Sequence, residues 1–298
     1  MADMNLPASW ADEPMLVDYL AEQLIRGRLG LFLGAGVSAF YGLPDWQQLL
    51  QKLLTRHGEA APVPGSDLVA KGAYLRAKYY SGKDDQFKKD LREALYDSAP
   101  VDFAKLRQNE TLAAIGSLVM ASKRGHAAKV ITLNYDNLLE NYLQFHGFTT
   151  ATVASERFWA QDEDVVIFHP HGFLPQGSGR ASENVVLGSS DYHEIMQSKG
   201  WRTMLDSALR THTFLYIGLS GVDMHLQSLW SDLSKQHAIA DERTRYHGVR
   251  FALATGTDEL GLVLEPKGIV THSLASYGAL SELLFRICQV ARDKRMRH

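Results

Sequence analysis

Four short apolar runs in this 298-residue sequence are each followed by polar side chains, in three cases together with glycines, and these residue types bind phosphate, ribose or water. The first run is Leu29–Leu33, which is followed by Gly34, Ala35, Gly36 and then Ser38. Glycine has no Cβ, so backbone N–H groups can approach a pyrophosphate closely at such a turn. We therefore expect these four residues to form a phosphate-contacting loop, with a tight strand-to-loop turn as the alternative.

Two common nucleotide motifs do not fit this loop. The segment satisfies G-x-G-x-x-A, but Gly42 and Pro44 end the helix early, and a helical pattern follows where a dinucleotide fold would have its second strand. The loop also lacks the G-x-x-x-x-G-K-[ST] pattern of the triphosphate loop. Kinase and ATPase chemistry is therefore not favoured.

The second run, Val130–Leu133, is followed by Asn134 and Asp136. Polar side chains just past a buried parallel strand lie where such sheets bind their ligands. The competing interpretation is that Asn134 or Asp136 caps the helix expected over "NLLENYL". For Asn134 we favour a role in the site, and for Asp136 both interpretations stay open.

The third run, Val165–Phe168, is followed by His169 and His171. His171 precedes a glycine, which suits an imidazole that projects into a crowded pocket and acts as a base near neutral pH. His169 is interpreted as structural. A His-x-His pair can also hold a metal, but further ligands would be needed, and with 12 histidines such a spacing arises by chance. No metal is expected.

The fourth run, Phe214–Ile217, is followed by Gly218, Ser220 and Asp223. The segment "GLSG" is not the G-x-S-x-G of serine hydrolases, because its second glycine comes one residue too soon. Ser220 and Asp223 therefore fit a binding role, as a hydroxyl and a carboxylate for ribose hydroxyls or phosphate.

The elements that would position these loops indicate an α/β fold. Apolar runs alternate with helical patterns, which predicts a Rossmann-like, doubly wound, mostly parallel sheet with helices on both faces. A charge-rich block with helical spacing, at about residues 47–125, predicts a helical insertion into a single domain of residues 1–298. The predicted strands are Leu29–Leu33, Val130–Leu133, Val165–Phe168, Val185–Leu187, Phe214–Ile217, Val249–Leu253 and the weaker Ile269–Leu274. The predicted helices outside the insertion include Met15–Ile25, Tyr192–Met196, Trp201–Leu209 and Met224–Leu233.

Composition excludes several classes of protein. The net charge is −3, so no basic field predicts direct nucleic-acid binding. The one cysteine, Cys288, excludes an internal disulfide and a multi-cysteine zinc site, and it is expected to be a small buried group. The acidic start of the sequence lacks a signal-like apolar core, and no run is long enough to span a membrane, so we expect a cytoplasmic protein.

Together the four loops resemble the ordered motifs of the sirtuin superfamily. The matching segments are Gly34-Ala-Gly36-Val-Ser38, Gly42-Leu-Pro44-Asp45, Thr132-Leu-Asn134-Tyr-Asp136, His171-Gly172 and Gly218-Leu-Ser220. The resemblance implies a Rossmann-like domain that binds NAD and breaks its nicotinamide–ribose bond. Protein-deacylating sirtuins usually carry a four-cysteine zinc module, and their glycine-proline-aspartate segment continues into an aromatic residue and an arginine. This chain has one cysteine, and Gln47 stands after Trp46. It is therefore most similar to the sirtuin-like NAD hydrolases of bacterial anti-phage defence.

That resemblance implies a role for each residue. Asn134 would orient the attacking water or a ribose hydroxyl, His171 would be the general base, and Asp45 and Asp136 would lie near the nicotinamide. The remaining contacts to NAD would come from the residues that hold its phosphates and its adenosine side: Gly34, Ala35, Gly36, Ser38, Thr132, Gly218, Ser220 and Asp223.

The resemblance also implies partners, and it leaves other functions open. A homo-oligomer is expected, and a hexameric DNA-translocating ATPase is a possible partner by family analogy. The alternatives are an NAD-dependent protein deacylase, a module that senses NAD or a related nucleotide without cleaving it, and a metal-dependent hydrolase that uses His169 and His171.

Overall fold

The structure is a computed structural model. It describes residues 12–61, 67–97, 99, 101–156, 162–177, 179–219, 226–228, 230–232, 247–254 and 259–297. The predicted binding residues Ser220 and Asp223, and part of the helix predicted at Met224–Leu233, lie outside the described residues.

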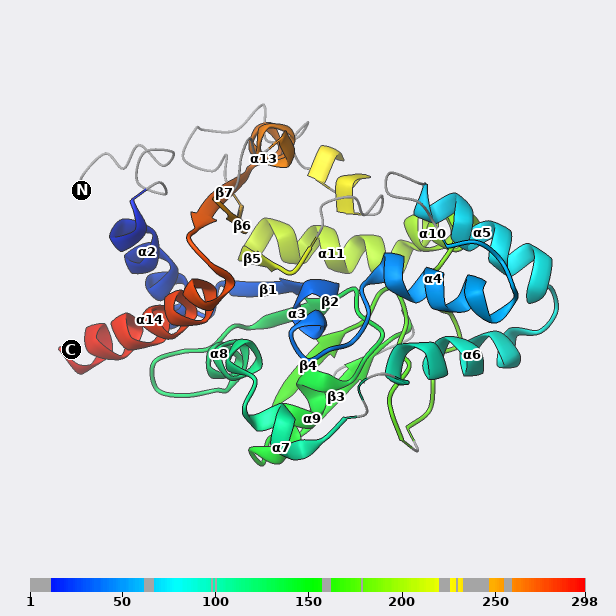
Figure 1. Cartoon of the computed structure of the whole chain (residues 1–298). Helices are drawn as coiled ribbons and strands as arrows, with labels where there is room; N and C mark the ends of the chain where they lie inside the picture. Colours follow the sequence, from blue (N-terminus) through cyan, green and yellow to red (C-terminus); the bar gives the residue numbers. More distant parts are fainter. Residues whose placement is uncertain are drawn as a thin grey trace.

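A seven-stranded, wholly parallel sheet forms the centre of the chain (Figure 1). Its order is β3-β4-β2-β1-β5-β6-β7. The chain starts in the middle at β1, moves to one edge, and returns past β1 to the other edge. This doubly wound, Rossmann-like topology confirms the predicted fold class. The strands are β1 (Leu29–Leu33), β2 (Lys129–Thr132), β3 (Thr150–Val153), β4 (Val165–Phe168), β5 (Thr213–Ile217), β6 (Gly248–Leu253) and β7 (Ile269–Leu274).

One predicted strand was wrong, and one strand of the sheet was not predicted. Val185–Leu187 is buried but forms no strand, because it crosses the end of the sheet in an excursion that folds back on itself. Backbone bonds from Val186 N to His171 O (2.9 Å) and from Ser182 N to Phe173 O (2.9 Å) hold that excursion. The edge strand β3 was missed, because its sequence "TATV" is short and only alternate residues are buried.

Side-chain alternation along the central strands separates two hydrophobic layers. In β1, Leu29, Leu31 and Leu33 belong to one layer and Phe32 belongs to the other. Gly30 would point the same way as Phe32, but a Cβ there would lie 2.6 Å from the ring of Phe214 on the neighbouring strand. The aromatic ring therefore takes the place of a side chain, which explains a glycine in the middle of a buried strand.

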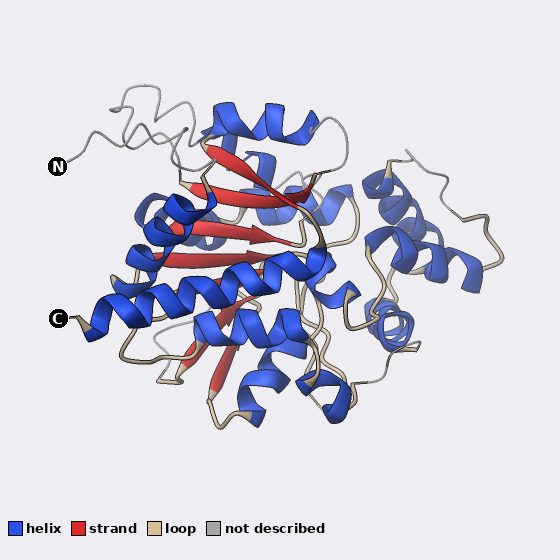
Figure 2. Cartoon of the chain, turned by 60° about the vertical axis from the view of Figure 1, so that its left-hand side comes forward, coloured by secondary structure: helices blue, strands red, loops and turns tan. Residues whose placement is uncertain are grey.

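Helices cover both faces of this sheet (Figure 2). The first layer contains α2 (Glu13–Ile25), α8 (Glu110–Val119), α9 (Leu138–Phe145) and α14 (Tyr277–Met296). The second contains α10 (Ser189–Gln197), α11 (Lys199–Thr211) and Leu264 of α13 (Glu259–Leu264). Cys288 lies buried in α14.

Six helices follow β1 before the chain reaches β2. They are the short α3 (Ala35–Ala39), α4 (Trp46–Arg56), α5 (Leu68–Tyr79), α6 (Asp84–Tyr96), α7 (Phe103–Arg107) and α8. Helices α4, α5 and α6 lie beyond the ends at which the strand arrows point (Figures 1 and 2). Helix α8 packs instead against α14 over the sheet. The helical block at residues 47–125 therefore has one part beside the strand ends and one part in the covering layer.

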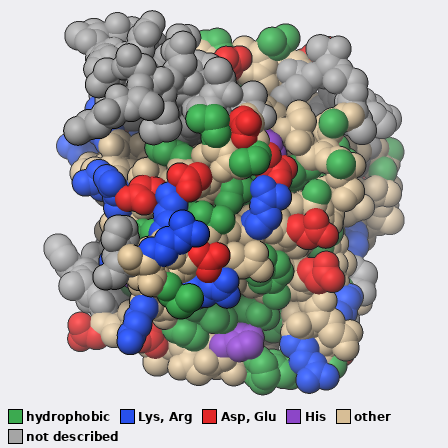
Figure 3. Space-filling view, turned by 90° about the vertical axis from the view of Figure 1, so that its left-hand side faces the viewer, with side chains coloured by type: hydrophobic (Ala, Val, Ile, Leu, Met, Phe, Trp, Pro, Cys, Tyr) green, Lys and Arg blue, Asp and Glu red, His purple; other side chains and the backbone are tan. Residues whose placement is uncertain are grey.

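The side of the molecule that carries α2 and α14 shows cations and carboxylates interspersed (Figure 3). Lys294 pairs with Asp18 at 2.8 Å, and Arg286 pairs with Glu13 at 2.6 Å, so these charges link the two helices. Within the described part of the chain, no helix is both long enough and apolar enough to cross a membrane.

Candidate functional site

The carboxyl ends of β1, β2 and β5 meet where the direction of winding reverses. Open parallel sheets bind ligands in the crevice at this point, because the loops of neighbouring strands diverge there. The loops after these strands begin at Gly34, Leu133 and Gly218, and the loop after β4 lies one strand further along. The predicted site residues therefore come from adjacent strand ends.

The glycines after β1 are required by the backbone of the neighbouring loop. Gly34 N donates to Ile217 O and Gly36 N donates to Gly218 O, each at 2.9 Å. A Cβ on Gly34 would lie 2.5 Å from Gly218 O, and one on Gly36 would lie 2.7 Å from Gly218 Cα. Gly218 itself has φ of +71°, which favours glycine. The tight-turn alternative thus accounts for the glycines, and the phosphate contacts stay predictions.

Three side chains from the loops after β1 and β2 form one hydrogen-bonded cluster. Asn134 Nδ2 donates to Gly34 O at 3.0 Å and to Ser38 Oγ at 2.9 Å. Ser38 Oγ in turn donates to Asp136 Oδ2 at 2.6 Å. Because both amide hydrogens of Asn134 are donated inward, its Oδ1 is the atom that can accept a bond from a bound water or hydroxyl.

Asp136 is buried at the base of this cluster. Its Oδ1 accepts from Leu138 N at 3.1 Å, at the start of α9, so the carboxylate also serves the helix end as the capping interpretation predicted. Burial raises the pKa of Asp136, and the hydrogen bonds from Ser38 and Leu138 N oppose that rise. Asp136 therefore holds Ser38 in the cluster and links it to the start of α9.

Tyr135 connects the loops after β2 and β4. Its carbonyl accepts from Leu174 N at 2.7 Å, and its hydroxyl donates to Val186 O at 2.5 Å. His171 lies buried in the segment bridged in this way, with its ring edge-on to Tyr192 at a centroid distance of 5.3 Å. Neither Tyr135 nor Tyr192 was predicted to position the site, because tyrosines in apolar surroundings have the pattern of ordinary core residues.

A buried pair of Glu140 and His169 lies under Asn134. Glu140 Oε1 is 2.7 Å from His169 Nε2, and His169 Nδ1 donates to Asn134 O at 2.9 Å. Burial opposes the imidazolium charge, but Glu140, the Asn134 carbonyl and Asp136 together outweigh burial and raise the pKa of His169. His169 was predicted to be structural, and Glu140 was not singled out. The sequence did carry a signal for this pair. Glu140 follows β2 and His169 follows β4, and these neighbouring strands end at the same edge of the sheet.

Asp45 and Trp46 lie at the start of α4. Asp45 Oδ1 accepts from Gln48 N at 2.8 Å, and Gln48 Oε1 accepts from Asp45 N at 3.0 Å, which is a reciprocal capping box. Trp46 is half-buried beside Tyr192, and its Nε1 is buried with no acceptor among the described residues. A buried donor without an acceptor is costly, so this indole can donate to a ligand.

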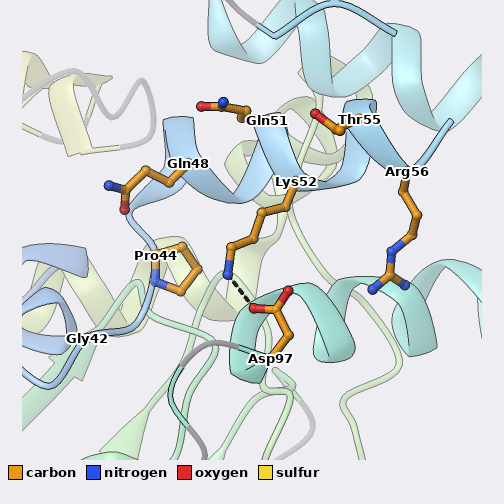
Figure 4. Close-up of a pocket in the computed structure, with 8 residues that line it drawn as sticks. All are labelled: Gly42, Pro44, Gln48, Gln51, Lys52, Thr55, Arg56 and Asp97. Carbon is orange, nitrogen blue, oxygen red and sulfur yellow. Dashed lines mark hydrogen bonds and ion pairs between the residues drawn. The ribbon is translucent and has the colours of Figure 1, made fainter. Parts of the chain in front are cut away.

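An open cleft of about 650 Å³ lies between α4 and α6 (Figure 4). Inside it Lys52 contacts Asp97. Arg56, which also lines the cleft, pairs with Glu93 at 2.9 Å. The cleft is lined by Gly42, Pro44, Gln48, Gln51, Lys52, Thr55, Arg56 and Asp97. It borders the segment that carries Asp45, whereas the Asn134 cluster lies on neighbouring loops. The cations are already paired with carboxylates, so we do not assign the reacting atoms to it.

The structure thus brings Gly34, Ser38, Asn134 and Asp136 into one cluster. Thr132 joins it, because its Oγ1 accepts from Asn134 N at 3.1 Å. Of the other predicted residues that the structure describes, Ala35 and Gly36 lie in the loop after β1 and Gly218 packs against that loop. His171 lies on the loop after β4, and Asp45 lies at the start of α4.

The geometry gives little support to the alternative of a metal-dependent hydrolase that uses His169 and His171. Both ring nitrogens of His169 are engaged by protein groups, so this ring is not placed to share a metal with His171. Among the residues that the structure describes, no three histidine, cysteine or acidic side chains lie together as a metal site.

Comparisons with known proteins agree with this fold. Residues 128–269, which include Asn134, Asp136 and His171, match the family of SIR2-like domains. This match to a SIR2-like domain, over the part of the chain that it covers, confirms the predicted resemblance to the sirtuin superfamily.

Two curated proteins are similar to this chain at low sequence identity. The chain is 27% identical over 214 residues to Defense-associated sirtuin 2 of Bacillus subtilis, across 70% of this chain and 20% of that protein. It is 24% identical over 230 residues to NAD(+) hydrolase ThsA of Enterococcus faecium, across 74% of this chain and 43% of that protein. The chain therefore spans less than half the length of either relative.

Proposed function

We propose that this chain hydrolyses NAD at the nicotinamide–ribose bond, releasing nicotinamide and ADP-ribose, as an effector of anti-phage defence. The observation that carries the proposal is the Asn134–Ser38–Asp136 cluster at the winding reversal, with His171 on the adjoining loop. The similarity to an NAD(+) hydrolase and to a defence-associated sirtuin supports both the substrate and the setting.

Cleavage of this bond depends more on the positioning of NAD and the attacking water than on a strong acid or base. The bound nicotinamide ring is cationic and leaves as a neutral molecule, so positive charge develops on the ribose. Asn134 Oδ1 accepts a hydrogen bond from the attacking water or from a ribose hydroxyl, and His171 takes the proton that the water loses. A positioned general base contributes about 10²–10⁴-fold to a rate. Asp136, held by Ser38, keeps the Asn134 loop in place.

Product analysis tests the proposal. Purified protein is incubated with NAD, with and without candidate activating partners, and the products are identified by chromatography. Nicotinamide and ADP-ribose formed without any acylated peptide support hydrolysis. NAD loss only with an acylated lysine peptide would support the deacylase alternative, and NAD binding with no product under any condition would support a sensing module.

Two variants and a matched control assign the residues. Asn134→Ala and His171→Ala are expected to abolish NAD cleavage while the fold is kept. His193→Ala changes an exposed histidine on α10 and is expected to keep wild-type turnover. Near-normal turnover in either of the first two variants would contradict the assignment.

The homo-oligomer and the hexameric ATPase partner stay predictions. Mass measurement of the purified protein would check the first, and co-purification would check the second.

A further inference from the structure

The Glu140–His169 pair is more deeply buried than any group to which the proposed chemistry gives a role. His169 is 0% exposed and Glu140 is 3% exposed. Taking ionisable groups out of water is costly, and a buried ion pair is often no more stable than apolar residues of the same volume. A pair at this position therefore calls for an explanation other than stability.

The positions of the protons follow from the partners. His169 Nδ1 faces the carbonyl oxygen of Asn134, which can only accept, so Nδ1 carries a hydrogen. Nε2 faces Glu140 Oε1, and the two share one further proton, whichever atom holds it. Thr152 Oγ1, on β3, donates to the same carboxylate oxygen at 3.2 Å, a longer contact than the one to His169.

This arrangement clamps the backbone of Asn134 at both of its polar groups. Its carbonyl accepts from His169 and its N–H donates to Thr132 Oγ1, while its side chain reaches Gly34 and Ser38. With the backbone and the amide nitrogen fixed, the direction of Asn134 Oδ1 is fixed as well. His169 also stands two residues before His171, so the same clamp ties together the loops that carry the two proposed catalytic residues.

We propose that Glu140 is a positioning residue, which acts through His169 to hold the Asn134 carbonyl and so aims Asn134 Oδ1 at the reacting ribose. The inference rests on the proposed NAD hydrolysis. It assigns a function to a pair that touches no substrate, and it predicts that Glu140 affects the rate of reaction more than the binding of NAD.

Three variants test the clamp. Glu140→Leu removes the partner of His169, and kcat for NAD cleavage is expected to fall by about 10²-fold, as for a misplacement on the order of 1 Å. KM is expected to change by less than about threefold, because binding contacts are kept. Glu140→Gln can donate its amide hydrogen to Nε2 of a neutral His169, and it is expected to restore most of kcat. Thr152→Val removes the other hydrogen bond to Glu140 and is expected to keep near-normal kcat.

A second readout does not depend on turnover. In the wild type, the Nδ1 hydrogen of His169 should give a downfield, slowly exchanging imidazole proton resonance, assigned by its loss in His169→Gln. The resonance should persist in Glu140→Gln and be lost in Glu140→Leu. Three results would overturn the proposed role of Glu140: equal kcat in Glu140→Leu and the wild type, a rise in KM as large as the fall in kcat, or no recovery of kcat in Glu140→Gln. The expected resonances without any NAD cleavage by the wild type would overturn the proposed function instead.

Discussion

Ser38 Oγ donates a 2.6 Å hydrogen bond to Asp136 Oδ2, across 98 positions of sequence. The two residues follow β1 and β2, which pair in the centre of the sheet. The bond therefore forms only when these strands are in register, and it places Asn134 against Gly34 at the same time. The cluster is thus a product of the sheet topology, and its chemistry depends on contacts between distant motifs.

Ser38→Ala tests the importance of that bond. It leaves the Asp136 carboxylate buried without its hydroxyl donor and removes one of the two acceptors of the Asn134 amide. We expect the free energy of unfolding to fall by about 1–3 kcal/mol and NAD cleavage to fall with it. Urea denaturation and a nicotinamide-release assay measure the two effects. The control is Ser281→Ala, a buried serine whose side-chain partner among the described residues is Thr111 at 3.5 Å. Equal behaviour of the two variants would contradict the prediction.

Asp45 has a capping role in the structure and a predicted role near the nicotinamide. Two substitutions separate these roles. Asp45→Ala removes the cap of α4 and is expected to cost about 1 kcal/mol of unfolding free energy. Asp45→Ser keeps a capping oxygen, so it should restore stability, measured by urea denaturation, but not NAD cleavage. Full turnover in Asp45→Ser would show that Asp45 is a cap alone.

Gly36→Ala tests the close approach of the two strand-end loops. The new Cβ would meet Gly218 Cα at 2.7 Å and Gly218 O at 3.0 Å, and both are backbone atoms that cannot rotate away. We expect a loss of about 1–3 kcal/mol in the free energy of unfolding. In the control Gly278→Ala, the nearest atom to the Cβ is Ser276 Oγ at 3.7 Å. That variant should be as stable as the wild type or slightly more so, because alanine favours the helix.

The sequence predicted the parts of the fold that depend on local pattern. Apolar runs identified six of the seven strands, most clearly β1 and β5, because strands covered on both faces contain few polar residues. Val185–Leu187 shows the limit, since burial alone makes a segment apolar whether or not it joins a sheet. The edge strand β3 was missed for the opposite reason, as it is only half covered.

The residues of the candidate site could be predicted from the sequence better than the contacts between them. Asn134, Asp136 and Ser38 were singled out because polar side chains follow buried strands, and the sheet does bring them together. The role of Gly218 as the neighbour that requires Gly34 could not be inferred, because it depends on the order of strands. The clamp by Glu140 was missed, since a glutamate within a helix normally faces solvent.

The Glu140–His169 pair also makes stability depend on pH. The pKa of His169 is raised in the folded protein above its ordinary value of 6.5, so the folded state holds this proton more tightly than the unfolded chain does. The stabilisation is therefore fully present below pH 6.5, and it is lost as the pH rises through the folded pKa. Glu140→Gln removes the carboxylate that raises this pKa.

The difference in unfolding free energy between the wild type and Glu140→Gln is accordingly expected to be largest in acid and to shrink in alkali. Urea denaturation at several pH values on both sides of 6.5 measures it. The measurements are made above about pH 5, where a glutamate in the unfolded chain is ionised. Every titrating group other than Glu140 and His169 is common to both proteins, so its contribution cancels in the difference, provided that the variant keeps its fold. A difference that stays constant or grows as the pH rises would mean that His169 gains no proton affinity from Glu140. The buried pair would then act through its neutral hydrogen bonds alone.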